Sequence, residues 1–117
     1  WLAGRVEACV AAGLPHDKLI VDPGIGFGKT VDHNLALLNG LSALQALGCR
    51  VLLGASRKRF IAAVDRDGPA VDRLGGSLAA VLIGAVQGVS IFRVHDVAAT
   101  RQALAIFSAI ASVNASS

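Results

Sequence analysis

Charged side chains follow three apolar runs of the sequence, and their types point to a particular chemistry. Asp22 ends the first run, Lys58 follows the second, and Arg93 and His95 alternate at the end of the third, in "FRVHDV". A carboxylate can accept hydrogen bonds from the ring N–H and NH₂ groups of an amino-heterocycle. Arg beside His is a common pairing for a phosphate group. These residues therefore predict a site for a small ligand that combines a heterocycle with an anion.

The stretch "LIVDPGIGFGKT", residues 19–30, is as rich in glycine as a nucleotide-binding loop but fits neither common template. The Walker pattern requires a glycine where the chain has Pro23, and the dinucleotide fingerprint requires one where it has Lys29. Asp22 with Pro23 and Gly24 is also an ordinary turn signal. Two interpretations of Asp22 therefore remain open, a turn residue and a ligand-binding carboxylate.

Phe27 lies between two glycines of the same loop. Glycines let a backbone approach a flat ligand without Cβ atoms in the way. Phe27 is accordingly either a packing residue or one wall of an aromatic slot, and Lys29 and Thr30 are interpreted as the end of the loop.

The stretch "GASRKRF", residues 54–60, places three cations directly after the second apolar run. One interpretation is a solvated helix start. Cations at a helix N-terminus oppose the helix dipole, however, so the arrangement is unfavourable unless an anion lies there. We assign Lys58 to the site and expect Arg57 and Arg59 to point sideways to loops or solvent. Asp96, beyond the third run, is interpreted as a helix cap.

Composition and charge narrow the class of protein. The chain has 117 residues, a net charge of +3 and no Met. Its basic residues lie at loop starts rather than along one helix face, which favours small anionic ligands over nucleic acid. Without a secretory leader or an apolar run near the ~20 residues of a membrane span, we expect a cytoplasmic protein with no membrane partner. Because residues 1–12 match the tail of an amphipathic helix, we expect a fragment of a longer protein.

Hydrophobic patterning predicts an α/β fold. Near-continuous apolar runs predict strands buried on both faces of a parallel sheet, over residues 18–22, 50–54 and 90–94. Helical patterns predict helices over 32–47, 73–87 and 97–113, the first capped by Asp32 and the third by Asp96. An open doubly wound sheet and a (β/α)₈ barrel both fit this order. Because chemistry follows all three strands, the pattern favours about three βα units of a barrel.

Four stretches, in order along the chain, closely resemble the dihydropteroate synthase family of pterin-binding (β/α)₈ enzymes. They are "LIVDPGIGFGKT", "LLGASRKRFIA", "DRLGGSLAA" and "FRVHDVAATRQAL", and together they span nearly the whole sequence. The resemblance implies that residues 1–117 are the C-terminal portion of a pterin-binding TIM-barrel domain. The glycine loop would follow barrel strand six and would cradle a pterin–arene site rather than a nucleotide.

The resemblance implies condensation of 6-hydroxymethyl-7,8-dihydropterin diphosphate with p-aminobenzoate, which gives 7,8-dihydropteroate and pyrophosphate. Phe27, Ser56 and Lys58 would surround p-aminobenzoate, whose carboxylate would lie near the helix start after Ser56. The family also implies Mg²⁺ as a cofactor, with its ligand outside this chain, and a homodimer for the full-length protein.

For the other substrate, the resemblance assigns Asp22, Lys58 and Arg93 to the pterin and Arg93 and His95 to the diphosphate. Cations that hold pyrophosphate ease its departure and leave an electrophilic pterin methylene. Two rivals remain open. One is a Schiff-base aldolase barrel with Lys58 as its nucleophile, and the other is a non-catalytic or methyl-carrying pterin-binding barrel. The latter has less need of Arg93 with His95.

Overall fold

The structure is a computed structural model that describes residues 2–13, 19–26, 30–65, 68–69 and 73–115. Helices and strands alternate along the chain as the sequence predicts, with two additional short helices. The elements are α1 (Leu2–Ala11), β1 (Ile20–Val21), α2 (Val31–Asn39), α3 (Leu41–Gln45), β2 (Arg50–Leu53), α4 (Arg59–Val64), α5 (Leu74–Val86), β3 (Ile91–Phe92) and α6 (Val97–Ala115).

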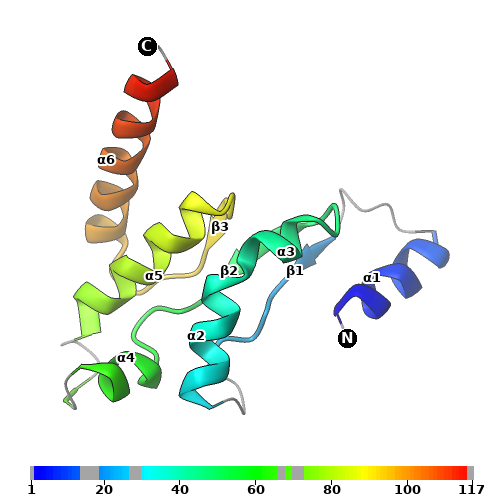
Figure 1. The fold of residues 1–117 in the computed structure, drawn as a ribbon, viewed down its shortest axis with the longest axis horizontal. Coiled ribbons are helices and arrows are strands. Elements are labelled where there is room, and N and C mark those ends of the chain that lie inside the picture. The colour runs from blue at the N-terminus through cyan, green and yellow to red at the C-terminus, as the bar shows by residue number, and fades with distance from the viewer. Residues whose placement is uncertain (1, 14–18, 27–29, 66–67, 70–72, 116–117) are drawn as a thin grey trace.

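The three strands form one parallel sheet in sequence order, β1-β2-β3 (Figure 1). Ile20 pairs with Arg50 on one side of β2, and Leu53 pairs with Phe92 on the other. The predicted order is confirmed, although each strand is shorter than its apolar run. Because all three strands are parallel, the residues that follow them lie at the same end of the sheet.

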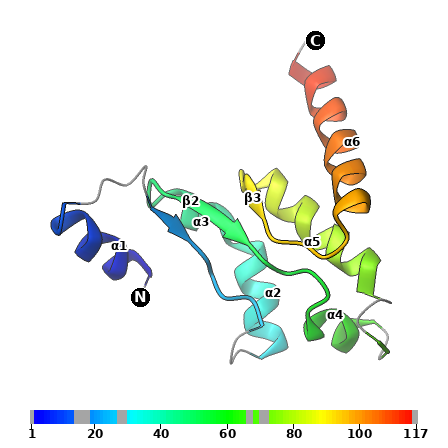
Figure 2. The same ribbon diagram turned by 180° about the vertical axis from the view of Figure 1, so that it is seen from behind.

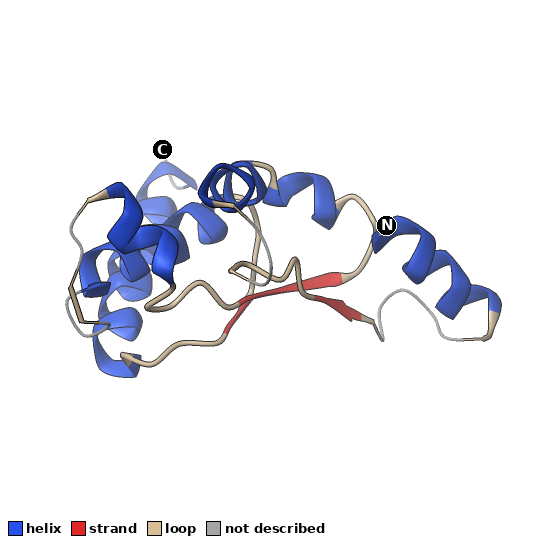
Figure 3. Cartoon of the chain, turned by 90° about the horizontal axis from the view of Figure 1, so that it is seen from below, coloured by secondary structure: helices blue, strands red, loops and turns tan. Residues whose placement is uncertain are grey.

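The helices lie on one side of this sheet (Figure 3), and α3 and α5 pack against it. On β2, Val51 and Leu53 are each only 1% exposed and belong to the hydrophobic core, which Leu41 and Phe60 from the helices join. Arg50 is exposed and Leu52 only half-buried. On β2 the described helices therefore bury one face of the sheet, while the other face carries the half-buried Leu52.

The helix predicted over residues 32–47 begins earlier than expected. Thr30, not Asp32, is its N-cap, since the Thr30 hydroxyl accepts a hydrogen bond from His33 N. Asp32 lies in the first turn, where a carboxylate is favourable. Thr30 thus starts the helix, a role more specific than the loop end assigned from the sequence.

The same helix is broken at Gly40 into α2 and α3. In an unbroken helix the Leu38 carbonyl would accept from Ser42 N. Here the Gln87 side chain lies between them: Nε2 donates to Leu38 O at 2.7 Å, and Oε1 accepts from Ser42 N at 3.0 Å. An amide side chain inserted in this way satisfies both backbone groups and accounts for the break.

Helix α5 packs closely on the sheet, and α6 lies against α5 (Figure 2). A Cβ on Gly84 would lie 2.8 Å from Leu53 Cδ2, so the glycine allows this approach. Gly88, at φ +94°, ends the helical path where the sequence predicts. Within the described residues, no helix has the length and apolar character needed to cross a membrane.

Candidate active site

Polar side chains converge where the three strands end. A cavity of about 450 Å³ is lined by residues of the loops after β2 and β3, namely Gly54, Ser56, Lys58, Arg93, Val94 and His95. Asp22, at the end of β1, reaches the same place, since its Oδ2 lies 3.6 Å from Arg93 Nη2. The predicted convergence of Asp22, Lys58, Arg93 and His95 is therefore found.

The interpretation of Asp22 as a turn residue is confirmed, and its second oxygen faces the candidate site. Its Oδ1 accepts a hydrogen bond from Gly24 N at 2.8 Å, which fixes the turn, while its Oδ2 faces Arg93. The Arg93 side chain lies across Gly54, where an added Cβ would be 2.6 Å from Nη2. Arg93 can therefore reach Asp22 only because the residue at position 54 has no side chain.

Lys58 extends over the glycine loop. Its Cδ would lie 3.1 Å from a Cβ built on Gly26, which has φ +89°. Asn34, which is buried, fixes this loop: its Oδ1 accepts a hydrogen bond from Gly26 N at 2.9 Å. Asn34 was not singled out from the sequence, where a polar residue near a helix start reads as surface. Asn34 lies on the same face of α2 as the buried Leu38, and this position is the feature of the sequence that could have indicated its burial.

Ser56 and His95 join the loops after β2 and β3. Ser56, 5% exposed, accepts a hydrogen bond from His95 N at 3.2 Å, and its Oγ lies 3.0 Å from His95 Nδ1. With the Ser56 hydroxyl donating to Nδ1, the ring proton of His95 lies on Nε2. The hydroxyl then donates one hydrogen bond and accepts another, both with His95. His95 would then present an N–H donor to a ligand.

Arg57 and Asp96 form a second link between the same loops. Arg57 Nη2 lies 2.8 Å from Asp96 Oδ1, and Nε lies 3.2 Å from Oδ2. The hydrogen bonds from Arg57 lower the pKa of the Asp96 carboxyl, and the same bonds raise the pKa of the Arg57 guanidinium. The expectation that Arg57 points sideways to loops or solvent is confirmed in its first form, since its guanidinium binds Asp96 in the loop after β3.

Asp96 also stands at the start of α6, where the sequence predicts a helix cap. Its backbone carbonyl accepts the first helical bond, from Thr100 N at 3.0 Å. Its carboxylate in addition accepts the two hydrogen bonds from Arg57. Asp96 therefore has a role between the loops as well as at the helix start.

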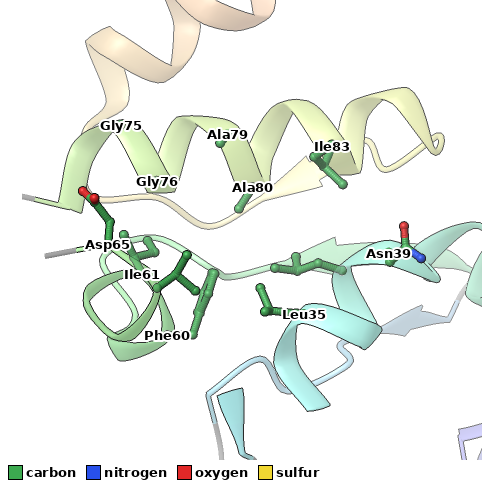
Figure 4. A pocket seen from close by; sticks show the side chains of 12 residues that line it. Leu35, Asn39, Phe60, Ile61, Asp65, Gly75, Gly76, Ala79, Ala80 and Ile83 are labelled. Carbon is green, nitrogen blue, oxygen red and sulfur yellow. The ribbon is translucent and has the colours of Figure 1, made fainter. Parts of the chain in front are cut away.

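A larger cavity of about 600 Å³ lies between α2, α4 and α5 (Figure 4). Its lining is mostly apolar, with Leu35, Phe60 and Ile83 among its residues, and it shares none with the cavity at the strand ends. Without a cation in this lining, it offers little to an anionic ligand. The cavity at the strand ends is the candidate active site because Lys58, Arg93 and His95 line it and Asp22 reaches it.

Comparison with known proteins agrees with this geometry. A family model described as "Pterin binding enzyme" matches residues 1–95. The chain belongs to this pterin-binding family. It is 45% identical to the dihydropteroate synthase of Haemophilus influenzae over 111 residues, which cover 95% of the chain and 40% of that protein. The chain thus spans about 40% of the length of this relative.

Solved structures of the family superpose closely on the chain. Dihydropteroate synthase from Xanthomonas albilineans, in complex with 7,8-dihydropteroate, is 43% identical with a TM-score of 0.88, over 93% of this chain and 42% of that one. The Thermus thermophilus enzyme, in complex with 4-aminobenzoate, is 44% identical with a TM-score of 0.84, over 92% and 43%. The predicted fold is confirmed: the parallel sheet and its helices are about three βα units of a TIM barrel.

Two expectations about the candidate active site lie beyond this geometry. Phe27 lies outside the described residues. The family resemblance also implies Mg²⁺, yet no three His, Cys, Asp or Glu side chains that could hold a metal come together within the described part of the chain. These residues do not fit a magnesium site, so no step below is derived through one.

Proposed function

We propose that the full-length protein is a dihydropteroate synthase of folate biosynthesis. It would condense 6-hydroxymethyl-7,8-dihydropterin diphosphate with p-aminobenzoate, forming 7,8-dihydropteroate and pyrophosphate. The observation that carries the proposal is the convergence of Asp22, Lys58, Arg93 and His95 at the strand ends of a chain from the pterin-binding family. Dihydropteroate synthases that are 40–45% identical to the chain support it.

The pterin half of the substrate would lie between Asp22 and Lys58. The Asp22 carboxylate accepts hydrogen bonds from ring N–H and NH₂ groups, and Lys58 donates to ring acceptors. Arg93 would stack on the ring as well as contact the diphosphate, because a guanidinium plane packs on aromatic faces. Its position across Gly54, beside Asp22, supports this double contact.

The diphosphate would be held by Arg93 and His95. In the reaction, the arylamine nitrogen attacks the pterin methylene, the bond from that carbon to the diphosphate oxygen breaks, and the electron pair leaves with pyrophosphate. The amine proton is then lost. Positive charge and N–H donors near the leaving oxygen favour the transition state, where negative charge develops on that oxygen.

The p-aminobenzoate would lie near Phe27, Ser56 and Lys58. Ser56 and Lys58 both line the cavity, and Lys58 directly precedes α4. A lysine ammonium beside the cavity would attract the carboxylate of this substrate. Mg²⁺, held outside this chain, a homodimer and a cytoplasmic location remain predictions for the full-length protein.

The test is an assay of the full-length protein with both substrates. We expect pyrophosphate release that requires p-aminobenzoate, with 7,8-dihydropteroate formed in equal amount. His95→Ala should slow product formation roughly 10²–10³-fold, the usual cost of losing one donor to developing charge. A wild-type protein that binds the pterin but forms no dihydropteroate would instead indicate a non-catalytic pterin-binding barrel.

A further inference from the structure

We propose that Arg57 and Asp96 are a positioning pair that sets the places of Lys58 and His95 in the candidate active site. This inference rests on the proposed function and adds to it two residues outside the set that would bind substrate. Arg57 directly precedes Lys58, and Asp96 directly follows His95. One ion pair therefore joins the two loops beside both candidate binding residues.

The geometry of the pair fixes orientation as well as distance. Two hydrogen bonds of 2.8 and 3.2 Å run from one edge of the Arg57 guanidinium to the two oxygens of Asp96. Such a bidentate contact holds both planes in one arrangement, which a Lys ammonium cannot reproduce. The two side chains are 27% and 26% exposed, so the pair is partly open to solvent and its effect comes from geometry rather than from burial.

The backbone of Arg57 is held in an uncommon conformation. Among the described residues, Arg57 is the non-glycine residue with positive φ, at +56°, a region that favours glycine. Its N–H donates to Ser77 Oγ at 2.8 Å, and its carbonyl accepts from Arg73 Nη1 at 2.8 Å. Residues at the start of α5 therefore bind both the N–H and the carbonyl of Arg57, while Asp96 binds its side chain.

This conformation has a direct consequence for the neighbouring residues. A left-handed residue changes the course of the chain, so that Ser56 is buried against His95 while Lys58 extends over Gly26. Relaxation of Arg57 to negative φ would turn Lys58 away from the glycine loop. Backbone strain at such a position is retained where the surroundings fix it, and the ion pair is the contact that joins the Arg57 side chain to the loop after β3.

Arg57 and Asp96 act through their neighbours rather than on a ligand. The cavity at the strand ends is lined by Lys58, His95 and Ser56 but by neither member of the pair. A purely stabilising role would change the melting temperature and leave the kinetics of the folded protein unaltered. A positioning role changes kcat/KM even where the protein is fully folded.

The experiment uses the full-length protein and three variants. Arg57→Lys keeps the charge but loses the bidentate contact, Asp96→Asn keeps the shape but loses the charge, and the double variant carries both changes. Arg50→Lys, at the opposite end of β2 on an exposed residue, is the matched control. Steady-state kinetics are measured with each substrate varied, well below every melting temperature, together with calorimetric binding of a pterin analogue.

We expect each single variant to lose roughly 10- to 100-fold in kcat/KM for the pterin diphosphate, as small misplacements of binding groups do. The double variant should lose no more than the worse single variant, because both changes break one contact, and Arg50→Lys should match wild type. Folded variants with kcat/KM within twofold of wild type overturn the inference, even if they melt earlier. The activity of the wild type is measured before that of any variant, because an inactive wild type would overturn the proposed function itself.

If a variant fails to fold, Arg57→Gly provides the second test. Glycine adopts positive φ without strain, so this variant keeps the turn while removing the ion pair. A loss of kcat/KM in folded Arg57→Gly supports the role of the pair. Wild-type kinetics in that variant would show that the turn alone positions Lys58, and would overturn the assignment to Arg57 with Asp96.

Discussion

Arg93 Nη2 lies 3.6 Å from Asp22 Oδ2, although the strands that these residues follow, β3 and β1, do not pair with each other. The contact passes over β2 because Gly54 leaves room for the guanidinium. Three strand ends are thereby connected by one side chain. The candidate site depends on this small residue as much as on its charged groups.

Gly54→Ala is expected to reduce activity with little loss of stability. The new methyl group would lie 2.6 Å from Arg93 Nη2, and the end of a flexible side chain can move aside without disturbing the core. Arg93 would then leave Asp22 and the diphosphate. We expect kcat/KM for the pterin diphosphate to fall while the melting temperature stays near that of wild type. Unchanged kinetics would place Arg93 outside the site.

Asp22→Asn separates the two functions of this side chain. The amide oxygen can still accept from Gly24 N, so the turn should persist. The charged acceptor for the pterin is lost, and binding of a pterin analogue should weaken by ~1–3 kcal/mol. Isothermal calorimetry measures this change. Equal affinity in the variant and wild type would reduce Asp22 to a turn residue.

Ser56→Ala tests how His95 is oriented. The substitution removes the hydroxyl that lies 3.0 Å from Nδ1 and accepts from the His95 backbone. If Ser56 acts through His95, the double variant with His95→Ala should be no slower than His95→Ala alone. If Ser56 instead binds p-aminobenzoate, Ser56→Ala should raise the KM for that substrate and add to the effect of His95→Ala. Kinetics of the two single variants and the double variant decide between these roles.

The location of the site could be predicted from the sequence because the carboxyl ends of parallel strands meet at one edge of a sheet. Asp22, Lys58 and His95 each follow an apolar run, so strand order alone brings them together. The ion pair between Arg57 and Asp96 could not be predicted in the same way. Its partners are 39 residues apart, and each has a plausible local role, as a helix-start cation or a helix cap.

The break at Gly40 was missed for a similar reason. The apolar pattern continues through it, and no local signal opposes one long helix apart from the glycine itself. The interaction that accounts for the break comes from Gln87, which is 49 residues from Leu38. Hydrophobic periodicity reports only on the residues of the helix itself. Here the side chain of Gln87, at the end of α5, forms hydrogen bonds with backbone groups of α2 and α3.

The ion pair should make stability depend on pH in the acid range. Because hydrogen bonds from Arg57 lower the pKa of Asp96 in the folded state, its stabilisation is fully present above the ordinary value of 3.8. The stabilisation is lost as the pH falls through the lowered value. The melting temperatures of wild type and Asp96→Asn should therefore differ most near neutral pH and converge in acid. A constant difference at all pH values would show that the carboxylate charge is not what stabilises the pair.

Two glycines of α5 offer a matched test of how this helix packs on the sheet. A methyl group on Gly84 would lie 2.8 Å from Leu53 Cδ2 and 3.2 Å from the Phe92 ring, whereas one on Gly75 would meet nothing within 4 Å. Both changes to alanine gain helix propensity, up to about 1 kcal/mol. Only Gly84→Ala overfills the core, at a cost of about 1–3 kcal/mol.

Gly84→Ala should therefore be less stable than Gly75→Ala by roughly 1–3 kcal/mol, measured by chemical denaturation of the full-length protein. Leu53 ends the strand that leads into the loop with Ser56 and Lys58, so a shift of this side chain should also reach the site. We expect Gly84→Ala to weaken pterin-analogue binding and Gly75→Ala to leave it unchanged. Equal stability of the two variants would mean that α5 can move away from β2 without cost, and that the close contact at Gly84 does not position the strand.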